Sequence, residues 1–354
     1  MEDITPFLLS LLSKPGISGY EESVSEIIAD RWRPLVDELT ISPLRSLHGL
    51  RKAATNERRP TLMIAAHMDA IGLMVKTVNH GFLTITTVGG IDPRVLPGQL
   101  VTVHGKKELP GLVQLMPDRL LNNETASKAP TKNQLFVDTG LPQKELADLV
   151  KPGDLISFAQ SPFEMTGGYI AGHSLDNRAS VAALTLCLEE IKNYNLDCNV
   201  VAAATVQEEL HGIGAATSTF SVRPDLAFAV DVTFAKGPGS NDYRTFSLGE
   251  GPAIGLGANN HPALTQKMTA LAEELDIPYF IEAMPTSSGT DGMAMQIIAN
   301  GIPTQVLSMS LRYMHTSVEM TSLKDIARTG RLLARFITDL NPDSFSKLFE
   351  EKTL

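Results

Sequence analysis

Residues 61–72 read TLMIAAHMDAIG, and the rest of the chain is organised around this stretch. From Thr61 to His67 it is an apolar run of strand length, which is typical of a strand buried on both faces of a sheet. The run predicts that His67 lies at the carboxyl edge of that sheet, where α/β folds bind their ligands. A neutral imidazole is a good ligand for a divalent metal, and the nearby Asp69 can fix its tautomer. A histidine at a strand end is on its own more often structural, so the rest of the chain has to supply further ligands.

Strands and helices alternate on both sides of a long β-rich segment. Apolar periodicity and end signals predict helices at residues 4–13, 21–33, 174–194, 262–275, 290–299 and 322–339. Buried strands are predicted at NVVAAATVQ from Asn199, at LAFAVDV from Leu226, and at YFIEA and TQVLSM further on. Ser18 and Glu21 form a candidate capping box for the second helix, and Ser174 is a candidate N-cap. This alternation predicts an α/β fold in which a mixed, mainly parallel sheet is sandwiched by helices.

The segment 73–164 has a different texture. It contains short β-rich pieces (FLTITTV, QLVTVHG, LPGLVQLM and DLISFA) separated by glycine and proline, and one helical piece at 143–150. The polar stretch 117–132 is predicted to be a loop. Short strands at this spacing predict a small barrel or sandwich. The simplest organisation is a discontinuous α/β domain, residues 1–72 and 165–354, interrupted by an inserted β domain at 73–164.

Bulk composition argues against several classes of protein. The 354 residues suggest about two domains, and 43% hydrophobic with 20% charged residues describes an ordinary globular protein. No stretch approaches the ~20 apolar residues of a membrane span, and the N-terminal apolar run follows acidic residues, which predicts a helix rather than a signal peptide. Cys187 and Cys198 have no metal-binding or redox spacing and fit a reducing cytoplasm. A net charge of −10 argues against a nucleic-acid partner.

Several polar side chains are expected to converge on one rim of the sheet, because each follows a predicted strand or opens a helix. They are His67, Asp176, Glu208, Glu209, Asp231 and His315. The carboxylates among them would repel one another in a partly dry cleft, so a divalent metal is the natural counter-charge. Imidazole mixed with carboxylate, without thiolate, suits Zn, Co or Mn.

The number of ligands indicates two metal ions per chain. Two ions that share one carboxylate would each need about two further protein ligands plus solvent, and five ligands with Asp176 as the bridge meet that count. One carboxylate is then left over. Adjacent residues on extended chain point in opposite directions, so one of Glu208 and Glu209 can bind metal while the other faces the metal-bound water. Their spacing does not say which does which.

The chain resembles the tetrahedral (TET) aminopeptidases, family forty-two of the clan MH metallopeptidases, which includes glutamyl, leucyl, lysyl and deblocking aminopeptidases. The resemblance covers nearly the whole length, and its segments occur in the family's order: PGISGYE, AAHMD, GGIDPRVLPGQ, LFVDTG, LDNR, TVQEE, VDVT, LGEGPAI, SGTD and RYMHTSVE. It implies a catalytic α/β domain interrupted by a PDZ-like β-barrel domain that mediates assembly into dimers and tetrahedral dodecamers. The implied activity is a metallo-aminopeptidase, which removes single amino acids from peptides with free N-termini.

The resemblance also implies a role for each candidate residue. The implied ligands form two sets that share one carboxylate: His67, Asp176 and Asp231, and Asp176, Glu209 and His315. Glu208 matches the general base, and Asp69 matches the carboxylate that orients His67. The inserted β segment carries none of these residues, which is a further reason to expect a role for it in subunit contact.

Near the site the chain departs from the family's usual pattern. Ala70 stands where Glu is common, His173-Ser174 where Arg-Ala is common, and Leu-His-Gly-Ile-Gly at 210–214 where Val-Gly-x-x-Gly is usual. None of these positions is a proposed ligand, so the expected chemistry is unchanged, but the preferred N-terminal residue is left open. His173 and His211 are close enough in sequence to the site to be candidates for supporting the ligands.

Two other classes of function fit parts of the pattern. Paired carboxylates hydrolyse glycosides when they face each other across a sugar, roughly 5–10 Å apart, but Glu208 and Glu209 are adjacent and the histidines would be unexplained. Some family members were nevertheless once labelled endoglucanases. A non-catalytic peptide-binding or scaffold protein predicts a degraded ligand set, whereas every position here is filled. The chain has neither a G-x-S-x-G elbow nor an H-E-x-x-H helix.

Overall fold

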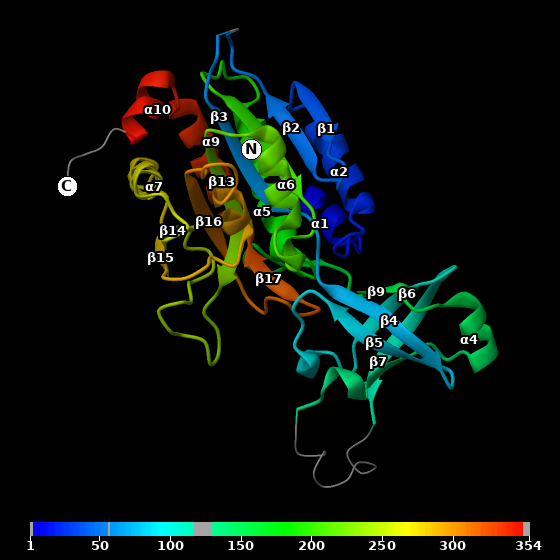
Figure 1. The fold of residues 1–354 in the computed structure, drawn as a ribbon. Helices are drawn as coiled ribbons and strands as arrows, with labels where there is room; N and C mark the ends of the chain where they lie inside the picture. The colour runs from blue at the N-terminus through cyan, green and yellow to red at the C-terminus, as the bar shows by residue number, and fades with distance from the viewer. Residues whose placement is uncertain (1–2, 56, 117–128, 350–354) are drawn as a thin grey trace.

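The computed structural model describes residues 3–55, 57–116 and 129–349. Their centre is a mixed eight-stranded sheet (Figure 1). In spatial order its strands are β1 (Glu38–Ile41), β2 (Leu47–Arg51), β12 (Asn199–Thr205), β3 (Thr61–His67), β13 (Leu226–Phe234), β16 (Thr304–Leu311), β14 (Ala253–Gly257) and β15 (Phe280–Met284). The central strands β12, β3, β13 and β16 run parallel, and both flanks contain antiparallel pairs. The prediction of a mixed, mainly parallel sheet is therefore confirmed.

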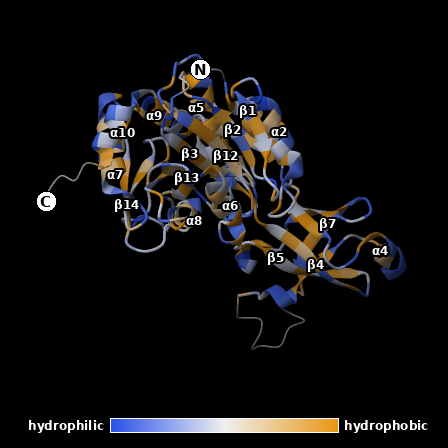
Figure 2. Ribbon diagram, turned by 45° about the horizontal axis from the view of Figure 1, so that its top comes forward, coloured by the Kyte–Doolittle hydropathy of each residue, from blue (hydrophilic) through white to orange (hydrophobic). Residues whose placement is uncertain are grey.

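Strand β3 is buried on both faces, which explains its continuous apolar sequence. Leu62 and Ile64 pack into the larger core cluster on one face, and Met63 and Ala65 pack into a second cluster on the other. Figure 2 agrees with this burial, because the inner strands have hydrophobic colouring and the outer surfaces of the helices have hydrophilic colouring. Because side chains alternate along a strand, His67 continues the series of Met63 and Ala65.

Helices cover both faces of this sheet. One face carries α1 (Thr5–Leu12), α2 (Glu22–Trp32), α5 (Leu175–Ile191), α7 (Pro262–Glu274), α9 (Leu323–Asp339) and α10 (Pro342–Phe349). The other face carries α6 (Ile213–Val222) and α8 (Asp291–Gln296). Among the described residues, no helix has both the length and the apolar character needed to cross a membrane.

A closed six-stranded barrel lies beside one end of the sheet (Figure 1). In order around the barrel its strands are β4 (Gly72–Asn79), β5 (Phe82–Val88), β8 (Leu135–Asp138), β7 (Glu108–Leu115), β6 (Leu100–His104) and β9 (Leu155–Phe158). It has its own apolar core and carries α4 (Gln143–Leu149). The next two strands, β10 (Phe163–Met165) and β11 (Tyr169–Gly172), form a small sheet with the distant strand β17 (Glu319–Ser322). The chain thus leaves the large sheet after β3 to form the barrel, and it returns to the α/β part before α5.

Two capping predictions are wrong. Glu21 occupies the N-cap position of α2 without a side-chain cap, and Ser18 Oγ instead donates to Asp69 Oδ2 at 2.5 Å. Ser174 does occupy the N-cap position of α5, but its φ is 69° and it makes no capping hydrogen bond. Of the predicted loop 117–132, residues 117–128 lie outside the described residues, and Lys132–Gln134 forms a short 3₁₀ helix.

Candidate metal centre

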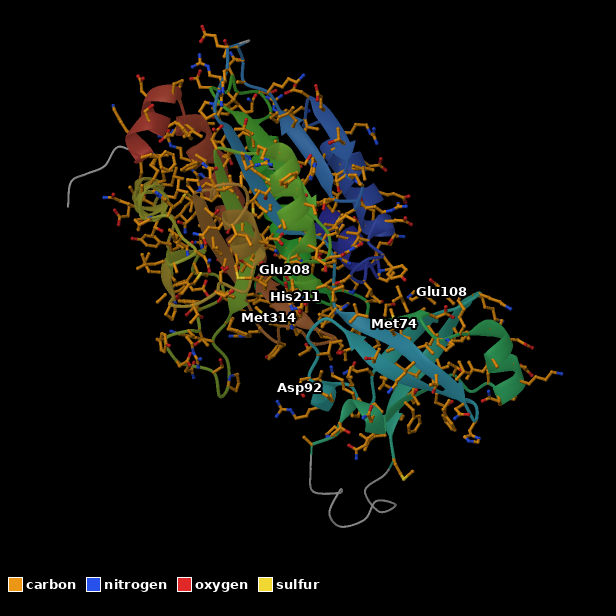
Figure 3. The ribbon with its side chains drawn as sticks, in the orientation of Figure 1. Met74, Asp92, Glu108, Glu208, His211 and Met314 are labelled. Atoms are coloured by element: carbon orange, nitrogen blue, oxygen red, sulfur yellow. The ribbon has the colours of Figure 1, made fainter. Side chains whose placement is uncertain are left out.

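The candidate side chains come from strand ends and from turns beside them. His67 ends β3, in register with Thr205 at the end of β12. Glu208 and Glu209 follow β12 in a 3₁₀ turn, so the prediction that they lie on extended chain is wrong. Figure 3 places Glu208 at the edge of the sheet that faces the barrel. Asp231 lies within β13.

Two groups of ligand-type atoms form at this edge, and both contain Asp176. In the first group, His67 Nε2 lies 3.1 Å from Asp176 Oδ1 and 3.9 Å from Asp231 Oδ1. In the second group, His315 Nε2 lies 3.3 Å from Asp176 Oδ2 and 3.3 Å from Glu209 Oε1. Each oxygen of Asp176 therefore faces a different histidine, as a bridging carboxylate would.

These spacings fit a divalent metal. Ligands about 2.0–2.1 Å from a tetrahedral ion lie roughly 3.3 Å from one another, and the nitrogen–oxygen distances in the two groups scatter around that value. The donor set of imidazole and carboxylate belongs to zinc and its neighbours rather than to Mg or Ca. The five residues in the two groups are the same five that the sequence analysis named as ligands.

The carboxylates of the centre outweigh the positive charge around them. Burial raises the pKa of Glu208 to about 9, and burial also raises the pKa of Asp231 well above its usual value. The carboxylates of Asp176 and Glu209 raise the pKa of His315 to about 11. Raised pKa values on both the acids and the histidine arise where several carboxylates share a poorly solvated site. A pair of cations would neutralise the carboxylates of both ligand groups.

The buried cation Arg178 does not supply this charge by direct contact. Its guanidinium is fully buried and donates to the carbonyl oxygens of Leu11 (2.7 Å), Lys14 (2.6 Å), Pro15 (2.8 Å) and Met68 (3.3 Å). It therefore ties the end of α1 to the segment after β3. Burial lowers the pKa of Arg178 to about 10.

Asp69 holds more than the histidine that the sequence analysis assigned to it. Its Oδ1 lies 3.3 Å from His67 Nδ1 and accepts the backbone N–H of Glu208 at 2.9 Å. Its Oδ2 accepts the Ser18 hydroxyl and, at 3.3 Å, the backbone N–H of Glu209. One buried carboxylate therefore lies against the imidazole of His67 and holds the turn that carries the two glutamates.

Glu319 plays a similar part on the other side and was missed from the sequence. It is 1% exposed, and its two oxygens accept the backbone N–H groups of Asp176 (3.0 Å) and His315 (2.9 Å). Glu319 thus fixes the shared carboxylate relative to the second histidine. It ends the segment RYMHTSVE, but it follows no strand, so its position gave no signal of its own.

Two further buried carboxylates support the turn around Glu208. Glu21 Oε1 accepts the backbone N–H groups of Gly19 (2.6 Å) and Gln207 (3.2 Å), and Asp291 Oδ2 accepts the Thr205 hydroxyl at 2.5 Å. Both lie in segments that resemble the family (PGISGYE and SGTD), but neither has ligand-like spacing. Only the folded chain shows what they contact.

Non-glycine residues with left-handed backbone conformation gather at these turns. Gln207 (φ 55°) precedes Glu208, His211 (φ 77°) closes the same turn, and His315 itself has φ 60°. Such conformations cost of order 1–3 kcal/mol each and persist where surrounding contacts impose them. The contacts around the centre therefore impose left-handed backbone at three positions.

The barrel reaches the centre through one loop. A Cβ atom added to Gly90 would lie 3.1 Å from His315 Nδ1, and one added to Gly89 would lie 3.1 Å from Glu209 Oε2. Gly89 also has φ 77°, which side chains rarely adopt. The inserted segment carries none of the ligands, but it is not remote from them, because these two glycines form part of the wall of the site.

The two histidines beside the site differ. His173 is buried, with Nδ1 3.3 Å from the carbonyl oxygen of Thr316 and Nε2 3.2 Å from that of Ile71. It also packs edge-on against Phe158 of the barrel, and burial lowers its pKa to about 4. It therefore joins the loop of His315 to the segment after β3. His211 is exposed, and its backbone N–H donates to the carbonyl oxygen of Glu208.

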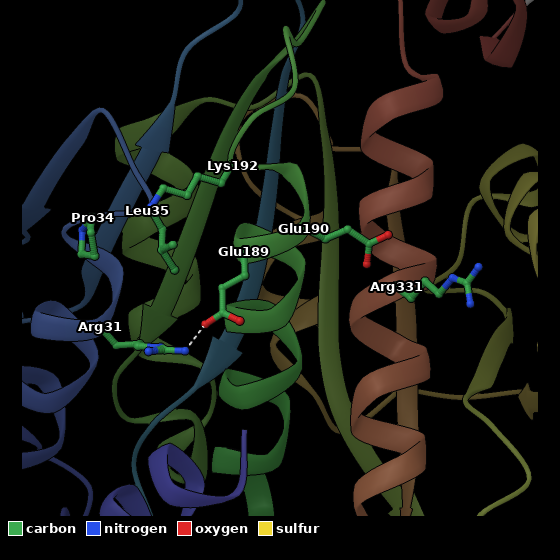
Figure 4. Close-up of a pocket in the computed structure, with 7 residues that line it drawn as sticks. All are labelled: Arg31, Pro34, Leu35, Glu189, Glu190, Lys192 and Arg331. Carbon is green, nitrogen blue, oxygen red and sulfur yellow. Dashed lines mark hydrogen bonds and ion pairs between the residues drawn. The ribbon is translucent and has the colours of Figure 1, made fainter. Parts of the chain in front are cut away.

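A surface hollow of about 680 Å³ lies elsewhere (Figure 4). Its lining includes Arg31 of α2, Glu189 and Glu190 near the end of α5, and Arg331 of α9, and Arg31 and Glu189 form an ion pair. Asp176 is at the first turn of α5, so this hollow lies at the opposite end of that helix, on the order of 20 Å away. The chemistry of the side chains, rather than the size of a cavity, identifies the candidate site.

Comparison with known proteins places this geometry among peptidases. The sequence profile of the M42 glutamyl aminopeptidase family matches residues 49–332. A lysyl aminopeptidase from Pyrococcus furiosus is 31% identical over 95% of this chain and 97% of its own. A TET aminopeptidase from a marine sediment archaeon of the Thaumarchaeota superposes with a TM-score of 0.91, at 27% identity over 98% of both chains. The TET1 peptidase of Pyrococcus horikoshii, which can assemble into a tetrahedron or a large octahedral shell, superposes with a TM-score of 0.83, at 29% identity over 96% of this chain and 100% of its own.

Proposed function

Because this chain belongs to the M42 glutamyl aminopeptidase family, we propose that it is a dinuclear metallo-aminopeptidase that removes single residues from the free N-termini of peptides. The observation that carries the proposal is the pair of ligand groups that share Asp176. His67 and Asp231 would complete one metal site, and Glu209 and His315 the other. Zn, Co or Mn suits both donor sets.

Bound divalent ions would polarise the scissile carbonyl and lower the pKa of the attacking water. Glu208 is the group positioned to move the proton. Its Oε2 lies 3.9 Å from His67 Nε2, and Asp69 holds its backbone N–H. Its carboxylate belongs to neither ligand group, so it is free to accept a proton. We assign to it the transfer of a proton from the water to the nitrogen of the leaving amine.

Substitution of Glu208 by glutamine tests this assignment. Because Glu208 belongs to neither ligand group, Glu208→Gln should keep full metal content while kcat falls by roughly 10²–10⁴-fold, the usual contribution of a positioned base. Glu164→Gln, on the exposed strand β10, is the matched control. Metal content by elemental analysis and hydrolysis of an aminoacyl anilide are the two measurements. Loss of a metal ion together with the activity would make Glu208 a ligand and contradict the assignment.

The requirement for a free N-terminus is tested with paired substrates. The protein should cleave a short peptide one residue at a time and leave its N-acetylated form intact. Equal rates on both forms would exclude an aminopeptidase, and release of reducing sugar from a glucan would support the glycoside-hydrolase alternative instead. Metal content at saturation tests the ligand count. One ion per chain at most would contradict a dinuclear site.

We also propose that the barrel is a PDZ-like domain that joins copies of this chain into dimers and a dodecamer. The assembly described for the P. horikoshii TET1 peptidase supports this, since that chain aligns over its full length. An enclosed particle would admit unfolded peptides and exclude folded proteins. Light scattering that shows only a monomer at every metal concentration would contradict assembly. A variant without residues 73–164 should be smaller and keep at least some metal binding, although it lacks Gly89 and Gly90, which lie beside the candidate ligands. Persistence of the large particle would move the subunit contacts to the α/β domain.

A further inference from the structure

A partly buried carboxylate, Glu282, lies on the same face of the sheet as the candidate centre. On β15, Glu282 alternates with Ala283, and the next residue on its face, Met284, packs into the cluster that includes Met63 and Ala65 of β3. That is the face towards which His67 points. Glu282 therefore lies on the face of the sheet that carries the candidate centre, although it is 51 positions beyond Asp231 in the sequence.

Strand register brings this carboxylate close to a metal ligand. Asp231 pairs with Ser308 on the neighbouring strand β16, and Thr233 follows Asp231 by two residues. The Thr233 hydroxyl donates to Glu282 Oε1, and the Ser308 hydroxyl lies beside the same carboxylate. Strands are about 4.8 Å apart, and two residues span about 6.7 Å along a strand. Through these contacts the carboxylate lies on the order of one strand spacing, about 5–7 Å, from the Asp231 position.

Among the described residues, the carboxylate of Glu282 lacks a positively charged partner and a full set of hydrogen bonds. No ion pair within the described ranges includes it, and its Oε2 has no hydrogen-bond partner there. The hydroxyl of the neighbouring Ser310, which is fully buried, also has no partner. Leaving a buried carboxylate oxygen without a donor is costly. Burial accordingly raises the pKa of Glu282, whereas an adjacent cation would keep it ionised.

We infer that Glu282 is a specificity-determining residue, which selects substrates whose first residue is lysine. This rests on the proposed function. With the first residue held at the metal centre, a lysine side chain extends on the order of 6 Å from its Cα and can bring its ammonium to Glu282 Oε2. A leucine side chain ends well short of the carboxylate, and a glutamate would meet a like charge. The neutral hydroxyls of Thr233 and Ser308 complete a polar end to a pocket of this length.

The wild-type protein alone provides a first test. Lysine and norleucine anilides have side chains of nearly equal length, and only lysine carries the charge. The metal-loaded protein should show kcat/KM at least ~30-fold higher for lysine than for norleucine, because a partly buried charge pair is lost with norleucine. Equal or better cleavage of norleucine would overturn the inference.

Glu282→Gln provides the second test. It should lower kcat/KM for the lysine substrate by about 30-fold or more and change that for norleucine by less than about threefold. Glu274→Gln, which removes a charge from a surface ion pair with Arg335, is the control and should change neither. Equal losses on both substrates would mean that Glu282 holds the α-amine of every substrate, and no loss would mean that it faces no substrate. Either outcome would overturn the assignment.

A binding measurement separates this inference from the proposed function. L-lysinol should raise the melting temperature of the metal-loaded wild type more than L-leucinol does, and Glu282→Gln should abolish the difference. Equal shifts in the wild type would overturn the inference even if turnover were normal. A wild type that discriminates between these ligands but cleaves no N-terminal residue would contradict the peptidase proposal while supporting the pocket.

Discussion

Replacing Asp69 by asparagine would remove one charge and one acceptor from a side chain that serves four groups. Its oxygens face His67 Nδ1, the Ser18 hydroxyl and the backbone N–H groups of Glu208 and Glu209. The hydrogen bonds and the neighbouring His67 lower the pKa of Asp69 in spite of its burial, so it is ionised at neutral pH. The substitution keeps the shape of the side chain and changes only its chemistry.

The size of the effect follows from counting acceptors. Asparagine has one carbonyl oxygen, which can keep Glu208 N–H and His67. The Ser18 hydroxyl can rotate to accept from the new amide, but the N–H of Glu209 cannot and is left facing a donor. One lost acceptor and the exchange of a charged for a neutral one cost about 1–3 kcal/mol. If this free energy is lost wholly at the metal centre, it corresponds to a roughly 5- to 150-fold loss of activity or metal affinity. Residues that support metal ligands typically contribute 10–100-fold.

We therefore expect Asp69→Asn to lower kcat/KM on an aminoacyl anilide by 10–100-fold, together with weaker metal binding. Ser18→Ala removes only one of the four contacts and should cost much less. Asp37→Asn is the matched control, because Asp37 also accepts a backbone N–H, from Lys52 at 2.7 Å, but at the surface. It should leave activity unchanged.

The reasoning would be refuted if Asp69→Asn kept activity and metal affinity within twofold of the wild type. It would also be refuted if the whole loss of activity followed the unfolded fraction, measured by circular dichroism at the assay temperature. In that case Asp69 would stabilise the fold without orienting the centre.

Three further predictions concern the same region. Glu319→Gln leaves the backbone N–H of either Asp176 or His315 without an acceptor. It should therefore weaken binding of the ion shared by Glu209 and His315 by about tenfold. Isothermal titration that shows two unchanged affinities would contradict this. The pKa of His173 is about 4 in the folded protein and ~6.5 when unfolded, so the unfolded state binds more protons between these values and stability falls as pH drops from 6.5 to 4, by about 3 kcal/mol in all. In urea titrations at pH 7 and 4.5, His173→Gln should therefore lose less stability than the wild type, and identical losses would oppose this account. Removal of divalent ions by a chelator should lower the melting temperature, because ions present at 100 times their Kd stabilise by about 2.7 kcal/mol, and an unchanged melting temperature would argue against a metal centre.

The strand ends were the part of the site that could be predicted from sequence. An apolar run such as 61–67 indicates a buried strand, and the polar residue that ends the run must then lie at the rim of the sheet. The packing of the rim depends on contacts that the local sequence does not encode. Ser18 has a good local capping pattern, but its hydroxyl donates to Asp69, 51 positions away. The hydroxyl is thus committed to a buried charged acceptor and caps no helix.

Glu319 and Glu282 were missed for the same reason, because their contacts are with distant parts of the chain. Glu319 contacts Asp176 across 143 positions, and Glu282 reaches Thr233 across 49. Neither follows a central strand of the sheet, so the pattern of polar residues at strand ends did not select them. Their partners are set by the strand order of the sheet and by the position of β17, which pairs with β11. Those features become visible only when the chain is folded.

The insertion of the barrel immediately after β3 has a consequence for synthesis. Strand β3 needs β12 on one side and β13 on the other, and residues 68–198 separate His67 from the first residue of β12. At about 5–20 residues per second, a ribosome takes on the order of 10 s to supply that neighbour. Meanwhile the barrel has all its strands and can close, whereas the apolar strand that ends in His67 stays unpaired on both edges. The strand that ends in the candidate ligand His67 is thus open to aggregation throughout that interval.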